Sequence, residues 1–156
     1  MPDEQIELRE VTQDNVAEVV GLRVKPGQEG IVATNSNSLA EAYVSNGRAW
    51  PRAVYADGVA VGFLMLDLTA PDQAAGVRGA CWVWRLMVDA EHQGKGYGSE
   101  AMRLAMAHVQ SLTFIDEILL TYKPHVPNLG AFYSSLGFEP TGAVDEDGEV
   151  VMRFAL

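Results

Sequence analysis

The sequence predicts a mixed α/β domain built around a central sheet. Apolar stretches with strand character alternate with amphipathic helical stretches, and turn residues separate them, which gives the expected order βααβββαβαβ. The chain has 156 residues, enough to bury a substantial core, and no linker or repeat divides it. We therefore expect one domain that spans residues 1–156.

The first third of the chain is expected to form a strand and two helices. Apolar and polar residues alternate over residues 6–9, which is typical of a strand. A helix should follow that Thr12 or Asp14 caps, and Pro26-Gly27 should end it. Ser38-Leu39-Ala40-Glu41 has the pattern of a capping box and predicts a short second helix that extends to about Tyr43.

Two Asp-Gly pairs predict hairpins. Asp57-Gly58 separates strands expected over 53–56 and 59–68, and Asp147-Gly148 separates strands expected over 141–144 and 149–154. A loop should cover 69–79 and a further strand 117–122. A helix should start at Asn128 and reach about Leu136, with Gly137 as its C-cap.

Candidate functional residues lie in the stretch between the two predicted hairpins. It contains an apolar strand over 82–88, a glycine-rich turn over 93–98 and a helix over 99–110. Gly94, Gly96 and Gly98 remove Cβ atoms where the backbone bends and approaches a ligand. The free N–H groups of the following helix, together with Lys95, predict an anion site suited to phosphate. The alternative is an ordinary glycine-rich turn between a strand and a helix.

The spacing of the turn distinguishes it from other phosphate-binding loops. It lacks the P-loop pattern, and its glycines do not have the spacing of the dinucleotide fingerprint. The pattern Gln-x-x-Gly-x-Gly is similar to the acetyl-CoA-binding motif of the GNAT family (GCN5-related N-acetyltransferases). The strand that ends at Val88-Asp89, together with the later Asn128, Tyr133 and Leu136-Gly137-Phe138, also resembles this family, over about residues 6–154.

The resemblance implies a mostly antiparallel, twisted sheet with flanking helices and one splayed pair of parallel strands, which end at Val88 and near Tyr122. Acetyl-CoA would lie in the splay as co-substrate, without a metal, and its pantetheine arm would pair with Met87 and Val88. The N–H group of Met87, or of a near neighbour, would polarise the thioester carbonyl. The other residues implied to contact the cofactor are Gln93, Gly94, Lys95, Gly96, Tyr97, Gly98, Ser99, Asn128 and Tyr133.

The implied reaction is direct attack of an amine on the acetyl thioester in a ternary complex. Tyr133 matches the family's proton donor, because a phenol still holds its proton at neutral pH and can pass it to the departing thiolate. Without the motif, Tyr133 would be interpreted as a half-buried helix aromatic. Some relatives carry a glutamate base eleven residues before the motif's first residue, where this chain has Trp82. A water chain to a backbone carbonyl or to a distant carboxylate is the expected substitute.

The acceptor amine is expected to be a cationic small molecule. Segments 22–24, 32–35, 38–40, 84–89 and 142–153 resemble bacterial diamine and polyamine acetyltransferases. Glu29 and Glu41 would then bind ammonium groups, and Trp84, with Tyr43 and Trp50, would line the methylene chain. The alternative is that both glutamates are solvated charges at helix ends. Arg85 either faces the acceptor or forms a salt bridge within the domain.

The amino-acid composition indicates which other classes of partner are disfavoured. Eleven Lys and Arg stand against 21 Asp and Glu, a net charge of −10, which disfavours nucleic acid and favours a cationic ligand, although an acidic surface also serves solubility. No apolar run reaches membrane-spanning length and the N-terminus does not resemble a signal peptide, so we expect a cytoplasmic protein. Cys81 is expected to be a buried core residue, and His92, His108 and His125 lack metal-ligand spacing.

Three alternatives stay open at this point. The acceptor could be another amine, such as an antibiotic, an amino-acid derivative or a protein N-terminus. The domain could also bind acyl-CoA without catalysis, since Trp82 stands where a base is found in some relatives. Members of the family are often dimeric, so a homodimer is expected, with no interface indicated by the sequence.

Overall fold

A computed structural model describes residues 4–156, and residues 1–3 of the acidic N-terminal stretch lie outside the description. The strands form a seven-stranded sheet with the order β1-β2-β3-β4-β5-β7-β6, in which β4 and β5 are the one parallel pair among the described strands. The strands are β1 (Ile6–Arg9), β2 (Ala49–Ala56), β3 (Val59–Thr69), β4 (Gly79–Val88), β5 (Ile115–Tyr122), β6 (Glu139–Val144) and β7 (Val150–Ala155). The predicted mixed α/β class and the mostly antiparallel sheet are confirmed.

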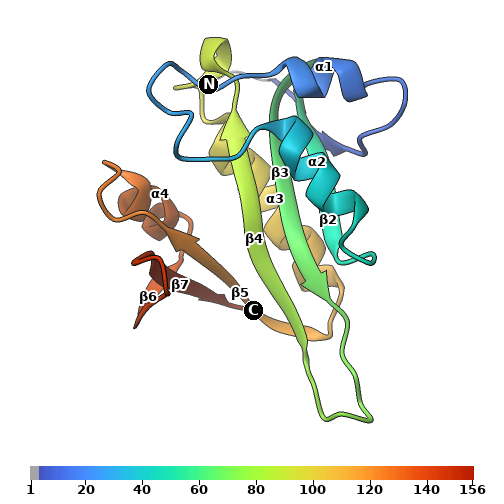
Figure 1. The fold of residues 1–156 in the computed structure, drawn as a ribbon, viewed down its shortest axis with the longest axis vertical. Coiled ribbons are helices and arrows are strands. Elements are labelled where there is room, and N and C mark those ends of the chain that lie inside the picture. The colour runs from blue at the N-terminus through green and yellow to red at the C-terminus, as the bar shows by residue number, and fades with distance from the viewer. Residues whose placement is uncertain (1–3) are drawn as a thin grey trace.

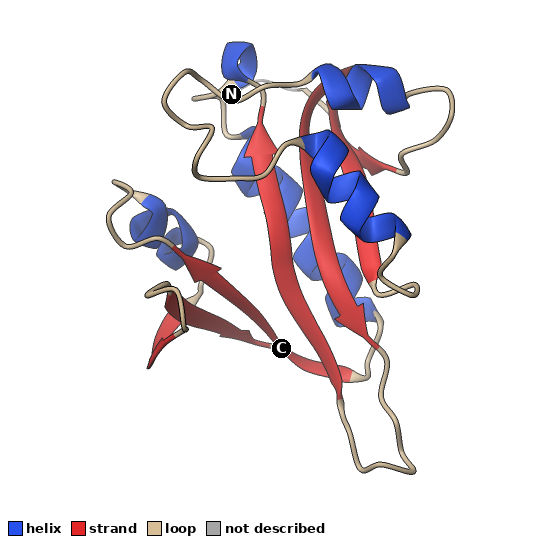
Figure 2. Cartoon of the chain, viewed as in Figure 1, coloured by secondary structure: helices blue, strands red, loops and turns tan. Residues whose placement is uncertain are grey.

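Helices cover both faces of the sheet (Figures 1 and 2). Helices α1 and α2 lie on one face and the long helix α3 on the other, while α4 lies beside the strands of the C-terminal part. The helices are α1 (Val16–Gly21), α2 (Asn35–Tyr43), α3 (Tyr97–Ser111) and α4 (Leu129–Ser135), and a short 3-10 turn spans Ala90–His92. No described helix is long and apolar enough to cross a bilayer.

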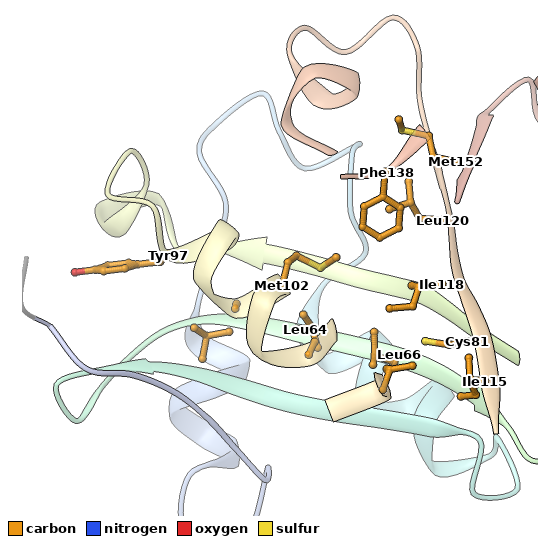
Figure 3. Close-up of a cluster of buried hydrophobic side chains, with 14 of the residues drawn as sticks. Leu64, Leu66, Cys81, Tyr97, Met102, Ile115, Ile118, Leu120, Phe138 and Met152 are labelled. Atoms are coloured by element: carbon orange, nitrogen blue, oxygen red, sulfur yellow. The ribbon is translucent and has the colours of Figure 1, made fainter. Parts of the chain in front are cut away.

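The larger of two hydrophobic clusters lies between α3 and the sheet (Figure 3). Met102 from α3 lies over Leu64, and Leu66 and Cys81 continue the cluster along the sheet. The same cluster continues through Ile118 and Leu120 of β5 to Phe138 and Met152. A second cluster on the other face holds α1 and α2 against β2, β3 and β4. One continuous core therefore joins the two halves of the sheet.

The backbone at the predicted turns confirms two of the sequence expectations. Asp57 and Gly58 have φ values of 48° and 80°, so both central residues of the β2–β3 turn take the left-handed conformation that a two-residue hairpin requires. Gly137 has φ 99° directly after α4, and the N–H of Phe138 donates to the Tyr133 carbonyl at 3.1 Å. This is the C-terminal capping arrangement predicted for that glycine.

The predicted N-terminal caps of the first two helices agree only in part with the structure. Asn15 directly precedes α1, and Thr12 caps the turn before it, since its hydroxyl accepts the N–H of Asp14 at 3.3 Å and its carbonyl accepts the N–H of Val16 at 2.9 Å. Helix α2 starts one turn earlier than expected, because the Thr34 hydroxyl accepts the N–H of Asn37 at 3.2 Å and already caps the helix. Ser38 therefore lies inside α2 and is fully buried.

The splay between the two parallel strands is the feature that positions the site. Strands β4 and β5 pair at Gly79↔Ile115, Cys81↔Ile118 and Trp82↔Leu119, and no pairing is present beyond these positions in the described structure. From there β5 continues along β7 instead, and the two strands diverge (Figure 2). The second half of β4 thus has β3 on one side and an unpaired edge on the other.

Cys81 gives a test of the packing at the point where the strands diverge. Its side chain is 1% exposed, and burial raises the pKa of the thiol to about 12. A thiol in this state carries little nucleophilic thiolate. We expect a colourless disulfide reagent that releases a coloured thiol to react far more slowly with the native protein at mildly alkaline pH than with the protein in concentrated urea. Equal rates in the two conditions would contradict the packing described here.

Candidate active site

A cleft of about 480 Å³ lies at the open end of the splay. Its walls come from the end of β4, the glycine-rich turn with the first residues of α3, and helix α4 with the segment before it. Val24, Gln28, Ile31 and Val32 from the loop between α1 and α2 form the remaining wall. The cleft therefore brings together the two sequence regions predicted to bind the cofactor.

The turn presents a row of unused backbone donors to this cleft. Among the described residues, no intramolecular acceptor engages the N–H groups of the six consecutive residues 94–99. Gly94 and Gly96 have φ values of 80° and 83°, a conformation that glycine adopts without steric cost. Gly96 is also the residue that precedes α3, so the positive end of the helix dipole adds to the donors. This arrangement suits a phosphate or pyrophosphate group.

Gln93 fixes the turn relative to β4. Its side-chain amide donates to the carbonyl of Val88 at 3.0 Å and to the side-chain oxygen of Gln28 at 2.9 Å. The first residue of the glycine motif therefore joins the end of β4 to the loop between α1 and α2. Gly98 faces the opposite wall, where an added Cβ would lie 3.6 Å from both the Phe132 ring and the Val88 side chain.

The free edge of β4 belongs to Leu86 and Val88. The N–H of Asp89 donates to the Val61 carbonyl at 2.8 Å, and the carbonyl of Met87 lies 2.5 Å from the position of a Cβ added to Gly62. Both residues thus direct their backbone groups towards β3. Since successive residues of a strand alternate in direction, the N–H and C=O groups of Leu86 and Val88 point to the opposite edge. The Val88 carbonyl is engaged there by the Gln93 amide, which leaves the Val88 N–H and both groups of Leu86 as the free edge.

Met87 lines the cleft, but its backbone groups face away from the free edge. Its N–H is directed towards β3, so it cannot polarise a carbonyl group in the cleft. Its side chain is 6% exposed, and the sulfur accepts a long contact of 3.7 Å from the Asn35 side-chain amide on the other face of the sheet. Val88 lies at the free edge, and Leu86 is the near neighbour of Met87 whose N–H also faces that edge.

Tyr133 reaches the cleft from α4. Its ring packs against Phe132, Tyr122 and Phe138, with centroid distances of 5.1, 6.3 and 6.1 Å. Burial raises the pKa of its hydroxyl to about 12. No described side chain or backbone group accepts a hydrogen bond from this hydroxyl, so the aromatic contacts alone orient the ring. The residue is both the half-buried helix aromatic and a protonated hydroxyl in the cleft.

The other residues predicted to contact the cofactor lie around the cleft in different ways. Ser99 lines it, whereas Lys95 and Asn128 do not. Lys95 is exposed beside the row of free N–H groups, and Asn128 precedes α4 with φ 68°. Tyr97 can offer only its backbone, because its side chain is buried and its hydroxyl donates to Glu4, an interaction that raises the pKa of the phenol to about 12.

A second cavity, of about 550 Å³, lies on the other side of the splay and shares Ile31 and Val32 with the first. We call it the acceptor cavity. It is lined by residues 29–33 between α1 and α2, Asp67 of β3, residues 82–85 of β4, Thr121 of β5, and Lys123 and Glu149. The lining includes three carboxylates, Glu29, Asp67 and Glu149. An elongated molecule in this cavity could thus reach the thioester position from the side opposite the cofactor.

Some of the residues predicted to bind the acceptor line this cavity and others do not. Glu29 and Trp84 line the cavity, and Arg85 does so while also forming a salt bridge of 2.9 Å with Glu41. The salt bridge considered for Arg85 is therefore present, and the same side chain also borders this cavity. Glu41 does not line the cavity, because its carboxylate contacts Arg85 and the Asn37 side chain, at 3.0 Å, instead.

Two aromatic residues lie away from the cavity, contrary to expectation. Tyr43 is 91% exposed at the end of α2, and Trp50 stacks on His108 with a centroid distance of 4.4 Å. Four residues at the two cavities were not predicted from the sequence, namely Leu86, Asp67, Lys123 and Glu149. One signal was available for Asp67, which is the only charged residue within the apolar strand β3.

Comparisons with known proteins agree with this geometry. Residues 33–138 match the model of the acetyltransferase (GNAT) family. A spermine/spermidine N(1)-acetyltransferase of Bacillus subtilis is 28% identical over 147 residues, which cover 94% of this chain and 96% of that protein.

Solved structures show the same fold. An aminoglycoside acetyltransferase AAC(6')-Ib in complex with coenzyme A aligns with a TM-score of 0.76 at 16% identity, over 97% of this chain and 95% of that one. A PaiA N-acetyltransferase from Thermoplasma acidophilum, also with coenzyme A, aligns with a TM-score of 0.67 at 18% identity, over 97% of this chain and 99% of that one. With two thirds of the sequence matched by the family model and the splayed strands in place, the chain belongs to the GNAT family and is an acetyl-CoA-dependent N-acetyltransferase.

Proposed function

We propose that this enzyme transfers the acetyl group of acetyl-CoA to a primary amine of a polyamine. The observation that carries the proposal is the acceptor cavity, where Glu29, Asp67 and Glu149 line one space together with exposed Trp82. Carboxylates attract ammonium groups, and an indole face covers methylene groups and cations. The name of the Bacillus subtilis relative supports the same substrate class.

The residues of the first cleft are suited to hold the cofactor. The free N–H groups of residues 94–99 would bind its pyrophosphate, and Ser99 would lie beside them. The N–H and C=O groups of Leu86 and the N–H of Val88 would bind the pantetheine arm as an added strand. Two of the walls are apolar, formed by Val88 with Phe132 and by Ile31 with Val32, and these would exclude water from the arm.

Acetyl-CoA supplies an acetyl group that is already activated as a thioester. The N–H of Leu86, at the free edge nearest the acceptor cavity, would stabilise the negative charge that develops on the carbonyl oxygen. The Tyr133 hydroxyl would donate its proton to the departing sulfur. Trp82 cannot take a proton from the incoming amine, so we assign this step to water that connects the amine with a carboxylate of the acceptor cavity.

Turnover of a panel of amines tests this function. The panel contains spermine, spermidine, putrescine, an aminoglycoside, free amino acids and a short peptide, and free CoA thiol is measured as it is released. We expect the highest kcat/KM on the polyamines. Highest kcat/KM on the aminoglycoside or the peptide would overturn the polyamine proposal. Absence of turnover on every amine, with CoA bound tightly in calorimetry, would overturn catalysis.

Replacing Tyr133 by Phe removes the proposed proton donor and keeps the aromatic packing. We expect kcat to fall by about 100-fold or more, because general acid catalysis typically contributes that much. The dissociation constant for CoA should change little, since the ring contacts stay. Tyr122→Phe, on the neighbouring strand β5, is the matched control and should keep most of the turnover. A Tyr133→Phe enzyme with the rate of the wild type would exclude the acid role.

The pH dependence of kcat should reflect the raised pKa of Tyr133. Because burial raises this pKa to about 12, the hydroxyl stays protonated as the pH passes the ordinary phenol value of about 10. We expect kcat to rise with pH as the acceptor amine loses its proton, without a falling limb up to a pH of about 10.5. If kcat already decreases at a pH below about 10.5 in the wild type but not in Tyr133→Phe, the pKa of Tyr133 is not raised as described.

Two substitutions at Gly96 distinguish the effect of added negative charge on CoA binding from the effect of an added side chain. Aspartate and asparagine at this position have nearly the same size and impose the same backbone strain at φ 83°. Only aspartate adds a negative charge beside the pyrophosphate, so we expect Gly96→Asp to weaken CoA binding about tenfold more than Gly96→Asn. Calorimetric titration with CoA measures both. Equal losses would mean that the turn does not hold the phosphates.

A further inference from the structure

A third cavity, of about 210 Å³, lies between the end of β4 and the loop that joins α1 to α2. We call it the side pocket. Its apolar lining consists of Leu22, Val24, Pro26, Val32, Ala33 and Met87. None of the steps assigned to the enzyme so far uses this space. An apolar cavity beside a reaction centre is suited to an apolar part of one of the reactants.

The side pocket adjoins the cofactor cleft next to the place proposed for the thioester. Val24, Val32 and Met87 line both cavities. Met87 directly follows Leu86, whose N–H would bind the thioester oxygen, and adjacent Cα atoms of a chain are about 3.8 Å apart. The hydrocarbon chain of an acyl group held by Leu86 would therefore start close to the side pocket.

The polar residues that line the side pocket already have partners within the protein. Arg23 and Asn35 donate side-chain N–H groups to backbone carbonyls of α1 and of the residue that follows it. Glu29 and Thr34 accept backbone N–H groups of nearby residues, at 2.7 and 3.2 Å. Asn35 is 2% exposed, so it offers little polar surface to the pocket. Hydrophobic contact is thus the main interaction available to a ligand there.

The volume of the side pocket limits the length of the chain that it can hold. A methylene group occupies about as much space as a water molecule in the liquid, roughly 30 Å³. The three carbons beyond the carbonyl of a butyryl group therefore need about 90 Å³, less than half of the pocket's volume of about 210 Å³. The nine corresponding carbons of a decanoyl group need about 270 Å³ and exceed this volume.

We propose that the side pocket takes the hydrocarbon chain of short acyl groups, so that the enzyme also transfers propionyl and butyryl groups from their CoA thioesters to its amine. The amine nitrogen forms a bond with the thioester carbonyl carbon, the C–S bond breaks, and CoA leaves as a thiol after its sulfur takes up a proton. The inference rests on the proposed position of the thioester and does not depend on which amine is the acceptor.

Rates with acetyl-, propionyl-, butyryl- and decanoyl-CoA test this inference, with the amine that gives the highest kcat/KM in the panel. A site fitted to the acetyl group alone would lose roughly 10- to 200-fold for one added methylene. We expect kcat/KM for propionyl- and butyryl-CoA to lie within about tenfold of that for acetyl-CoA, and that for decanoyl-CoA to be at least about 100-fold lower. A fall of more than about tenfold for propionyl- or butyryl-CoA, or undiminished rates with decanoyl-CoA, would overturn the proposal.

Substitutions of Leu22 change the volume of the side pocket, and among the three cavities this residue lines only that one. Leu22→Trp should lower the ratio of kcat/KM for butyryl-CoA to that for acetyl-CoA by about tenfold or more. Leu22→Ala frees roughly 90 Å³ and should raise the rate on decanoyl-CoA relative to butyryl-CoA. Val16→Trp adds the same bulky side chain on α1 outside the pocket and should keep both wild-type ratios. Wild-type ratios in both Leu22 variants would contradict the inference.

Calorimetry of the free enzyme provides a readout that needs no acceptor. Burial of two further methylene groups should make butyryl-CoA bind about tenfold more tightly than acetyl-CoA, and Leu22→Trp should remove this difference. Equal affinities in the wild type would exclude a chain in the side pocket. Glu29, Val32 and Ala33 also line the acceptor cavity. A Leu22→Trp enzyme with a raised KM for the amine and unchanged acyl ratios would therefore assign the pocket to the acceptor and overturn the proposal.

Failure of this inference is distinguishable from failure of the proposed function. An enzyme that acetylates polyamines but rejects propionyl- and butyryl-CoA keeps the polyamine function and loses the acyl role of the side pocket. An enzyme that acetylates no polyamine but binds butyryl-CoA more tightly than acetyl-CoA overturns the polyamine function and keeps this inference.

Discussion

The parallel pairing between β4 and β5 stops after Trp82, and both cavities exist because of this. A strand edge inside a protein normally finds another strand, since unpaired backbone groups are costly when buried. Here β5 turns to β7 for its pairing, which leaves the N–H of Val88 and both backbone polar groups of Leu86 facing open space. A ligand with an extended, amide-rich arm can complete the sheet at that position. The site is thus an interruption of strand pairing that the rest of the fold keeps open.

The separation of the strands is held by packing on both sides of it. On the α3 face, one hydrophobic cluster extends from the centre of the sheet through β5 to Phe138 and Met152, so the diverging strands share a core. On the other side, the loop between α1 and α2 is fixed to the open end of β4. The backbone N–H of Arg23 donates to Asp89 at 2.9 Å, and Gln28 contacts Gln93. The cofactor therefore meets walls that are already formed.

The sequence allowed prediction of those features that local chemistry determines. Three such features are the Asp57-Gly58 hairpin, the glycine-rich turn before α3 and the C-cap at Gly137. Each contains a glycine where the backbone takes a positive φ, a conformation that most other residues avoid. The cap of α2 was misplaced because Thr34 and Ser38 are equally good capping residues one turn apart, and only the buried environment of Ser38 decides between them. Local signals identify a helix more reliably than its first residue.

The features that could not be predicted depend on contacts between distant residues. The pair of Arg85 with Glu41 joins residues on different elements, so sequence alone could not assign Glu41 to it. The direction of the Met87 N–H depends on the register with β3, and a shift by one residue would have reversed it. Asp67 comes opposite Trp82 only through that same register. The candidate residues for cofactor binding were mostly recognisable, whereas the acceptor side needed the assembled sheet.

The close approach of Gly62 to Met87 restricts how this chain can vary over evolution. A Cβ at position 62 would lie 2.5 Å from the Met87 carbonyl, and the obstacle is backbone that cannot rotate away. Any other side chain would push β4 from β3 and shift the free edge at Leu86 and Val88, although residue 62 lines neither cavity. In a collection of active variants, position 62 should therefore be as intolerant of substitution as the residues of the site, without taking part in any chemical step.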